Sequence, residues 1–181
     1  MQSRSYEPIA SEDLDRLSAI AAADRADLFE RKPDTGRLYA DRLFAVALCQ
    51  GGALHFIDRV NGVKDLDVWS FYVERTERPF PYSRRGKADF GDPKVGQSDD
   101  RPGFVGRRVD LIGRSLVNVN PSRPIDALQH YLRAGGTPSA RFLAKKAVVM
   151  LDPRELRGTV IWPECDTNNA NSAKGMNHAR C

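Results

Sequence analysis

Apolar runs of strand length, separated by segments with helical spacing, are the feature that most constrains the fold of this chain. Such runs lie at residues 43–49, 66–73 and 147–151, and each is bounded by turn signals, as is typical of buried strands. Further strands are expected at residues 107–113 and 158–162. Helices are expected at residues 11–31, 37–42, 53–60, 124–134 and 139–146. The pattern predicts an α/β (α+β) fold, in which a small mixed sheet carries flanking helices, packed mostly on one side.

The length of the chain fits one domain. With 181 residues it can bury a core without disulfides or metals. From residue 164 onward the sequence is Asn-rich, polar and aperiodic. We therefore expect a single domain over residues 1–163 and a disordered tail over residues 164–181.

The composition indicates where in the cell the chain is expected to be located. No apolar run is long enough to span a membrane, and residues 1–8 lack the apolar core of a secretory signal. The cysteines Cys49, Cys165 and Cys181 are widely spaced and form no metal or redox motif, which favours a reducing, cytoplasmic location. Cys49 lies in an apolar run and is expected to be buried. The net charge of +4 permits an anionic partner without requiring one, and nothing indicates an oligomeric state.

Residues 74–104 differ in character from the rest of the chain. They are rich in proline, glycine, basic and aromatic residues, and a long irregular loop is expected there. Arg84, Arg85 and Lys87 form a basic cluster within it, which could contact phosphates or nucleic acid. An exposed, solubilising loop is an equally good interpretation.

Three carboxylates in apolar surroundings are the candidate site. Asp65 and Asp67 open the strand predicted at residues 66–73, and at positions i and i+2 they share one face of it. Neighbouring carboxylates repel unless a cation neutralises them, and such oxygen ligands suit Mg²⁺ or Mn²⁺. Asp110 lies inside another apolar strand, where a carboxylate has to be paired or metal-bound. If the two strands are neighbours, the three acids form a two-metal site for phosphoryl transfer. Alternatively, Asp65 merely caps the strand, and arginines such as Arg107 or Arg108 satisfy Asp67 and Asp110.

A Gly-Gly pair precedes the acids. Gly51 and Gly52 follow the first apolar run, and the helix predicted after them carries His55, which is interpreted as a core or surface residue rather than a catalytic one. Without Cβ atoms, the backbone N–H groups of two glycines can approach a phosphate closely at the start of a helix.

The order Gly-Gly, Asp-hydrophobic-Asp-hydrophobic, hydrophobic-Asp-hydrophobic resembles the signature of the DNA polymerase β-like nucleotidyltransferase superfamily. Residues 51–52, 65–68 and 109–111 match its three parts, and their order looks most like the CCA-adding enzymes and poly(A) polymerases. The resemblance implies a nucleotidyltransferase-like domain. In it, Asp65 and Asp67 hold Mg²⁺ or Mn²⁺, Asp110 helps to activate the attacking hydroxyl, and Gly51 and Gly52 contact the triphosphate.

The function expected from this resemblance is metal-dependent transfer of a nucleoside monophosphate from a nucleoside triphosphate, such as ATP, to an acceptor hydroxyl. The acceptor is left open between an RNA end, a small molecule and a protein side chain. Arg84, Arg85 and Lys87 are expected to help bind the triphosphate. The alternative is a catalytically silent nucleotidyltransferase-like module that binds nucleic acid or a partner protein.

Overall fold

The computed structural model describes residues 4–81, 83–97 and 102–164. The disordered tail expected at residues 164–181 lies outside the described residues, apart from Glu164. For residues 83–87 the description is limited to the backbone.

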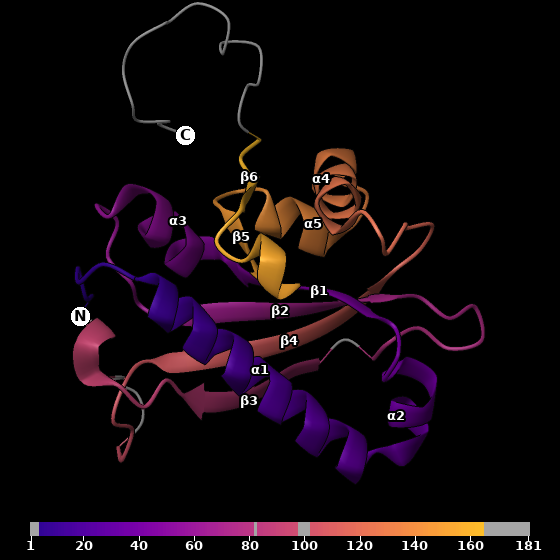
Figure 1. Cartoon of the computed structure of the whole chain (residues 1–181), viewed down its shortest axis with the longest axis horizontal. Helices are drawn as coiled ribbons and strands as arrows, with labels where there is room; N and C mark the ends of the chain where they lie inside the picture. Colours follow the sequence, from indigo (N-terminus) through magenta and orange to yellow (C-terminus); the bar gives the residue numbers. More distant parts are fainter. Residues whose placement is uncertain (1–3, 82, 98–101, 165–181) are drawn as a thin grey trace, which may run out of the picture.

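A six-stranded mixed sheet forms the centre of the fold (Figure 1), with strand order β3-β4-β2-β1-β5-β6. β2 and β4 are parallel, and the other neighbouring pairs are antiparallel. The strands are β1 (Leu43–Cys49), β2 (Leu66–Val73), β3 (Ser83–Asp89), β4 (Arg108–Leu116), β5 (Val148–Asp152) and β6 (Val160–Trp162). The helices are α1 (Ser11–Arg31), α2 (Pro33–Tyr39), α3 (Gln50–Asp58), α4 (Pro124–Ala134) and α5 (Pro138–Leu143), with short 3-10 helices at Pro93–Val95 and Arg154–Leu156.

The apolar runs of the sequence are the central strands of the sheet. β1 and β2 have the bounds predicted from the sequence, and β5 is displaced by one residue from the run predicted at 147–151. These strands are buried on both faces, which is why they are continuously apolar rather than alternating. The predicted mixed α/β (α+β) fold is confirmed.

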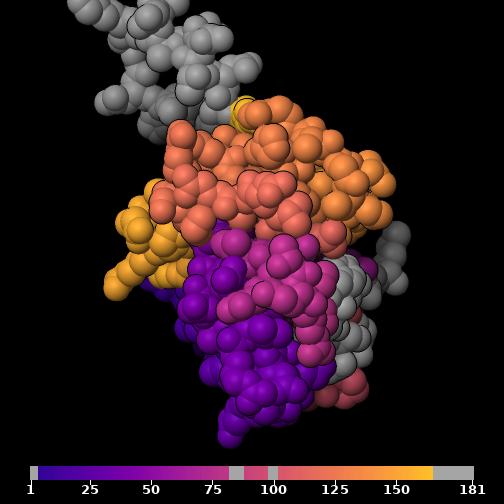
Figure 2. Space-filling model, turned by 90° about the vertical axis from the view of Figure 1, so that its right-hand side faces the viewer, coloured from indigo at the N-terminus to yellow at the C-terminus, as the bar shows by residue number. Residues whose placement is uncertain are grey.

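Helices cover both faces of the sheet, so the expectation that they pack mostly on one side is wrong. α1 and α3 contribute Leu17 and Ala53 to the core on one face. Leu128 and Leu143, from α4 and α5, belong to the core on the other face. Figure 2 looks onto the end of the sheet where β2 and β4 finish, with α4 (orange) above and the indigo α1 and α2 below. Strands buried on both faces need cover from both sides.

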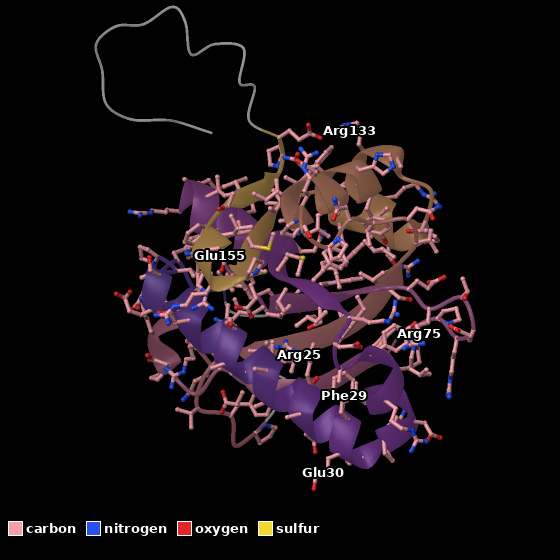
Figure 3. All side chains as sticks on the ribbon, turned by 45° about the vertical axis from the view of Figure 1, so that its right-hand side comes forward. Arg25, Phe29, Glu30, Arg75, Arg133 and Glu155 are labelled. Carbon is pink, nitrogen blue, oxygen red and sulfur yellow. The ribbon has the colours of Figure 1, made fainter. Side chains whose placement is uncertain are left out.

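Of the two N-terminal helices, α1 has the predicted bounds and α2 does not. Ala10 is the N-cap of α1, and its backbone N–H donates to the Asp13 carboxylate at 2.6 Å. α2 covers residues 33–39 rather than 37–42 because a proline can occupy its first position. At the other end of α1, Glu30 projects away from the sheet into solvent (Figure 3).

The segment expected to be an irregular loop contains an edge strand. β3 pairs antiparallel with β4, with a register shift between Arg85 and Lys87. The rest of the segment is fastened to α1, since Lys94 donates to Asp13 at 2.8 Å and Arg16 pairs with Asp92 at 3.3 Å. The hydrogen bond to Asp13 raises the pKa of Lys94.

Within the described residues, no helix combines the length and the apolar character needed to cross a bilayer.

Candidate active site

Asp67 and Asp110 lie side by side on neighbouring strands. They are register partners in the parallel β2–β4 pair, so their side chains leave the same face of the sheet. Leu66 and Val109, the preceding residues, belong to the core on the opposite face, beneath α1. Asp67 is 9% exposed and Asp110 is 1% exposed. Two buried carboxylates on neighbouring positions of a sheet repel each other and need positive charge nearby.

Arg108 supplies positive charge to two of the three candidate acids. Its Nη2 lies 2.8 Å from Oδ2 of Asp65 and 3.3 Å from Oδ2 of Asp110. The Arg108 side chain is 13% exposed, so the ion pair to Asp110, whose side chain is 2% exposed, is largely removed from water. Arg107 points elsewhere, and its Nε donates to the carbonyl of Val95 at 2.9 Å. The alternative interpretation of the sequence gives arginine partners to Asp67 and Asp110. It holds for Asp110 with Arg108, whereas the pairing of Arg108 with Asp65 was not predicted.

The acids fit a divalent cation by ligand type. Asp65 and Asp67 offer carboxylate oxygens, the ligands that Mg²⁺ and Mn²⁺ prefer, and both line one cavity. Asp110 is adjacent to Asp67 but nearly inaccessible. Across residues 4–81, 83–97 and 102–164, no three or more His, Cys, Asp or Glu side chains are grouped as a ready-made metal site. Asp65 and Asp67 thus line the cavity that a cation can enter, and Asp65 shares Arg108 with the nearly inaccessible Asp110.

The two glycines have different surroundings. A Cβ built on Gly51 would meet nothing within 4 Å, and Gly51 lines the cavity. A Cβ on Gly52 would lie 3.0 Å from Leu48 and 3.1 Å from Leu66. Gly51 therefore leaves open space at the start of α3, whereas Gly52 allows α3 to approach the sheet closely. Of the two glycines assigned to the triphosphate by the resemblance, Gly51 is the one that faces the open cavity.

Gln50 fixes the start of α3 in an unusual backbone conformation. Its φ of 58° lies in the left-handed region, which costs a residue with a Cβ about 1–2 kcal/mol. The side chain compensates by donating Nε2 to the carbonyls of Phe142 at 2.8 Å and Leu143 at 3.3 Å. The backbone N–H of Gln50 donates to the carbonyl of Ala147 at 2.9 Å. These bonds hold the C-terminal end of α5 beside the N-terminal end of α3.

A cavity of about 410 Å³ lies between these two helix ends, near the point where β1 finishes and β2 begins. In Figure 1, α3 stands at this end of the sheet. The lining includes Gly51 from α3 and the acids Asp65 and Asp67. It also includes Phe142, near the end of α5, and Lys145 and Lys146, which follow that helix. The remaining lining residues are Arg4, Gln50, Leu54, Asn61, Gly62 and Lys64.

Four cations surround this cavity against two carboxylates. Arg4, Lys64, Lys145 and Lys146 are all exposed, and none has an ion-pair partner within the described part of the chain. The only acids in the lining are Asp65 and Asp67. The excess of positive charge suits an anionic ligand.

Sequence reasoning missed Phe142, Lys145 and Lys146. Two lysines at the end of a predicted helix carry no functional signal, because cations are favoured there in any case. A signal was available in principle, because residues that lead into β5 must lie near the end of β1 if β5 pairs antiparallel with β1. That pairing joins Cys49 to Val148, but it could not be inferred from either strand alone.

Two other residues near the cavity are structural. Cys49 is fully buried, as expected, and burial together with the nearby Asp67 carboxylate raises the pKa of its thiol. His55 is also fully buried. Its Nδ1 lies 2.5 Å from the carbonyl of Asn61 and its Nε2 lies 2.6 Å from that of Glu7, so it fastens the loop after α3 to the N-terminal segment. The interpretation of His55 as a core residue is confirmed.

The basic cluster at Arg84, Arg85 and Lys87 lies in β3. The backbone register pairs Arg84 with Ile112, Arg85 with Leu111 and Lys87 with Asp110. The cluster is therefore in an edge strand beside the acid-bearing β4 rather than in an irregular loop. Its expected contact with a triphosphate concerns side chains outside the described part of the structure and stays a prediction.

Comparisons with protein-family models, with curated proteins and with solved structures found no match to this chain.

Proposed function

We propose that this chain is a metal-dependent nucleotidyltransferase, which transfers a nucleoside monophosphate from a nucleoside triphosphate to an acceptor hydroxyl. The observation that carries the proposal is that Gly51, at the start of α3, lines the same cavity as Asp65 and Asp67. The open space at Gly51 admits a phosphate, and the two carboxylates suit a hard cation. The same residues carry the resemblance to the DNA polymerase β-like nucleotidyltransferases.

In the proposed reaction, the acceptor oxygen bonds to the α-phosphorus of the triphosphate. The bond between this phosphorus and the bridging oxygen breaks, and pyrophosphate leaves. Mg²⁺ or Mn²⁺, held by Asp65 and Asp67, supplies positive charge to the phosphoryl oxygens. The residues of the chain orient the phosphates at Gly51 and exclude water around Asp67, which is 9% exposed.

Asp110 takes the acceptor proton in this proposal. Its carboxylate lies 3.3 Å from Arg108 and the residue is 1% exposed, so an acceptor hydroxyl cannot reach it while the ion pair is in place. Arg108 therefore has to release Asp110, remaining with Asp65 or turning toward a phosphate, before the proton is transferred. Arg108 is accordingly a positioning residue, and its replacement should alter the pH profile of the reaction as well as its rate.

A second candidate function is a catalytically silent module that binds nucleic acid or a partner protein. The observation that favours it is the same pairing of Arg108 with Asp65 and Asp110, because an internal cation removes part of the need for a metal. The two candidates differ in whether a triphosphate is cleaved at all.

The discriminating experiment measures pyrophosphate release from ATP, GTP, CTP and UTP with Mg²⁺ or Mn²⁺. Total RNA, small hydroxyl compounds and protein are supplied in turn as acceptors. The proposal expects metal-dependent release that the Asp67→Asn variant loses by at least about a hundredfold, as for a group that acts on the reacting phosphate. The control is Asp126→Asn on the exposed face of α4, which should keep full activity. No release with any acceptor would leave the silent module, and release that Asp67→Asn retains would show that Asp67 does not take part in the reaction.

We also propose a cytoplasmic location. The proposal rests on the spacing of the three cysteines, which forms no disulfide framework, and on the buried free thiol of Cys49. Nucleoside triphosphates are the proposed small-molecule partners, and a nucleic-acid end is one proposed acceptor.

A further inference from the structure

Phe142 is an exposed aromatic side chain on the wall of the candidate active site. It is 47% exposed, whereas the large apolar side chains of this chain are otherwise mostly in the core. Its own backbone carbonyl accepts the hydrogen bond from Gln50, so the residue is held at the mouth of the cavity. A ligand that covered this ring would gain the free energy of burying its apolar area.

Lys145 and Lys146 lie three and four residues after Phe142. Residues at these spacings share one side of a helical turn. The turn continues past α5, because the N–H of Lys145 bonds to the carbonyl of Phe142 at 3.3 Å and that of Lys146 to Leu143 at 3.5 Å. All three side chains line the cavity. One short segment therefore presents an apolar face and two cations to the same ligand.

We infer that residues 142–146 recognise the nucleoside triphosphate, with the nucleobase stacked on Phe142 and the phosphates bound by Lys145 and Lys146. The inference rests on the proposed function and names the parts of the substrate that this segment contacts. A base–aromatic stack and a charged phosphate tail match the two chemistries of the segment. The carboxylates that line the cavity can neither stack on a base nor attract a phosphate.

Recognition by stacking has a consequence for substrate choice. A ring stacks on the face of any base, and the edges that distinguish the four bases are not read by it. The side-chain amide nitrogens in the lining are already used within the protein, since Gln50 donates to Phe142 and Asn61 donates to Asp58. The stack on Phe142 therefore admits all four nucleoside triphosphates, with purines favoured by their larger stacking surface.

The test is a set of calorimetric titrations with three probes. The probes are a non-hydrolysable nucleoside triphosphate analogue, inorganic tripolyphosphate and the free nucleoside. Phe142→Ala should weaken the analogue by about 5- to 100-fold, which is the loss expected for one stacked base, and should leave tripolyphosphate unchanged. Lys145→Gln/Lys146→Gln should weaken both phosphate-bearing probes by about tenfold or more and reduce their salt dependence. Analogues of the four nucleotides should bind within about tenfold of one another.

Matched variants keep the result interpretable. Lys32→Gln/Arg154→Gln removes the same charge from exposed residues elsewhere and should bind as the wild type does. Phe142→Trp keeps an aromatic face and should retain binding, whereas Phe142→Leu keeps an apolar side chain and should not. Far-UV circular dichroism and the Tm of each variant check that it is folded, and Phe142→Leu serves if Phe142→Ala does not fold.

Two results would overturn the inference. One is an analogue affinity that Phe142→Ala and Phe142→Leu leave unchanged, and the other is an equal loss of tripolyphosphate binding in those variants. Either result can occur while pyrophosphate release persists, in which case the proposed reaction survives and this assignment does not. If the variants bind the probes as predicted but the protein releases no pyrophosphate, residues 142–146 still bind the nucleotide and the proposed reaction is wrong. A wild-type protein that binds none of the probes would remove both.

Discussion

Gln50 donates its side-chain amide to the main-chain carbonyl of Phe142 at 2.8 Å, although 92 positions separate them in the sequence. Both residues line the cavity that Asp65 and Asp67 also line. The bond also occurs at a residue with a left-handed backbone, φ 58°, immediately before Gly51 and Gly52. The position of the proposed substrate segment thus depends on one strained residue.

The hydrogen bond from Gln50 to Phe142 predicts which of two variants at position 50 is the more stable. Gln50→Ala removes the hydrogen bonds to α5 and keeps the backbone strain, so the free energy of unfolding should fall by about 1–3 kcal/mol. Gln50→Gly also removes the bonds but relieves a left-handed penalty of about 1–2 kcal/mol, so it should be the milder change. Urea unfolding of both variants checks this ordering. Equal stability of Gln50→Ala and wild type would contradict the role given to the amide.

Replacing Arg108 should destabilise the protein, because Asp65 and Asp110 lose their positively charged partner. Arg108→Met leaves Asp65 and Asp110 without this partner, and removing one member of a buried pair costs about 3–5 kcal/mol. If the acids hold a cation, millimolar Mn²⁺ should restore part of the lost Tm by binding the native state. Thermal unfolding with and without Mn²⁺ measures this effect. The control is Arg123→Met, which breaks an exposed pair with Asp126 and should neither unfold the protein nor create a response to Mn²⁺.

The two glycines should respond differently to one added methyl group. Gly52→Ala places a Cβ 3.0 Å from Leu48 and 3.1 Å from Leu66, and overpacking of this kind costs about 1–3 kcal/mol. Gly51→Ala meets no atom within 4 Å, so its stability should match or slightly exceed that of the wild type. Its affinity for a triphosphate analogue should nevertheless fall, because the methyl group enters the space proposed for phosphate. Denaturation and titration of the pair separate the packing role from the binding role, and weakened folding of Gly51→Ala would go against this division.

The pH dependence of stability should contain a contribution from Asp89. Burial opposes ionisation of this carboxyl, but backbone N–H groups of Gly91, Val105 and Gly106 donate to it at 2.9, 2.6 and 2.8 Å, and its pKa is lowered. A lowered native pKa means that the unfolded chain binds the proton more tightly. The stabilisation is therefore fully present above the unfolded pKa of about 3.9 and is lost as the pH falls through the native pKa.

Asp89→Asn provides the measurement. The difference in unfolding free energy between wild type and Asp89→Asn should be constant above about pH 5 and should shrink below about pH 4. Asp34→Asn, an exposed residue near the start of α2, is the control and should show a much smaller change. A difference that does not vary with acid would show that Asp89 is not held as an anion.

Local signals predicted the centre of the sheet and failed at the edge formed by β3. β1 and β2 are buried on both faces, so their sequences are apolar along their whole length and their bounds could be predicted. β3 has the sequence Ser-Arg-Arg-Gly-Lys-Ala-Asp and is held by main-chain pairing with β4, which leaves no apolar pattern to detect. Its strand conformation comes from its neighbour rather than from its own side chains.

The sequence predicted only those residues of the candidate site that lie in or next to strands. The i, i+2 spacing places Asp65 and Asp67 on one face, and an acid within an apolar strand drew attention to Asp110. An arginine partner for Asp110 was one of two interpretations left open by the sequence, but the pairing of Arg108 with Asp65 was not predicted. The contribution of residues 142–146 depends on a contact across 92 positions between Gln50 and Phe142, which no local pattern encodes.

The place of β1 in the sheet affects the order in which a growing chain can complete its fold. β1 lies between β2, which follows it closely in the sequence, and β5, which ends at Asp152. A nascent chain on the ribosome can form the β1–β2 pair early, but the other edge of β1 keeps its backbone groups unpaired until residues 148–152 have been synthesised. Because β1 is almost entirely apolar, this open edge is the part of the nascent chain most exposed to wrong pairing with another chain or to capture by a chaperone.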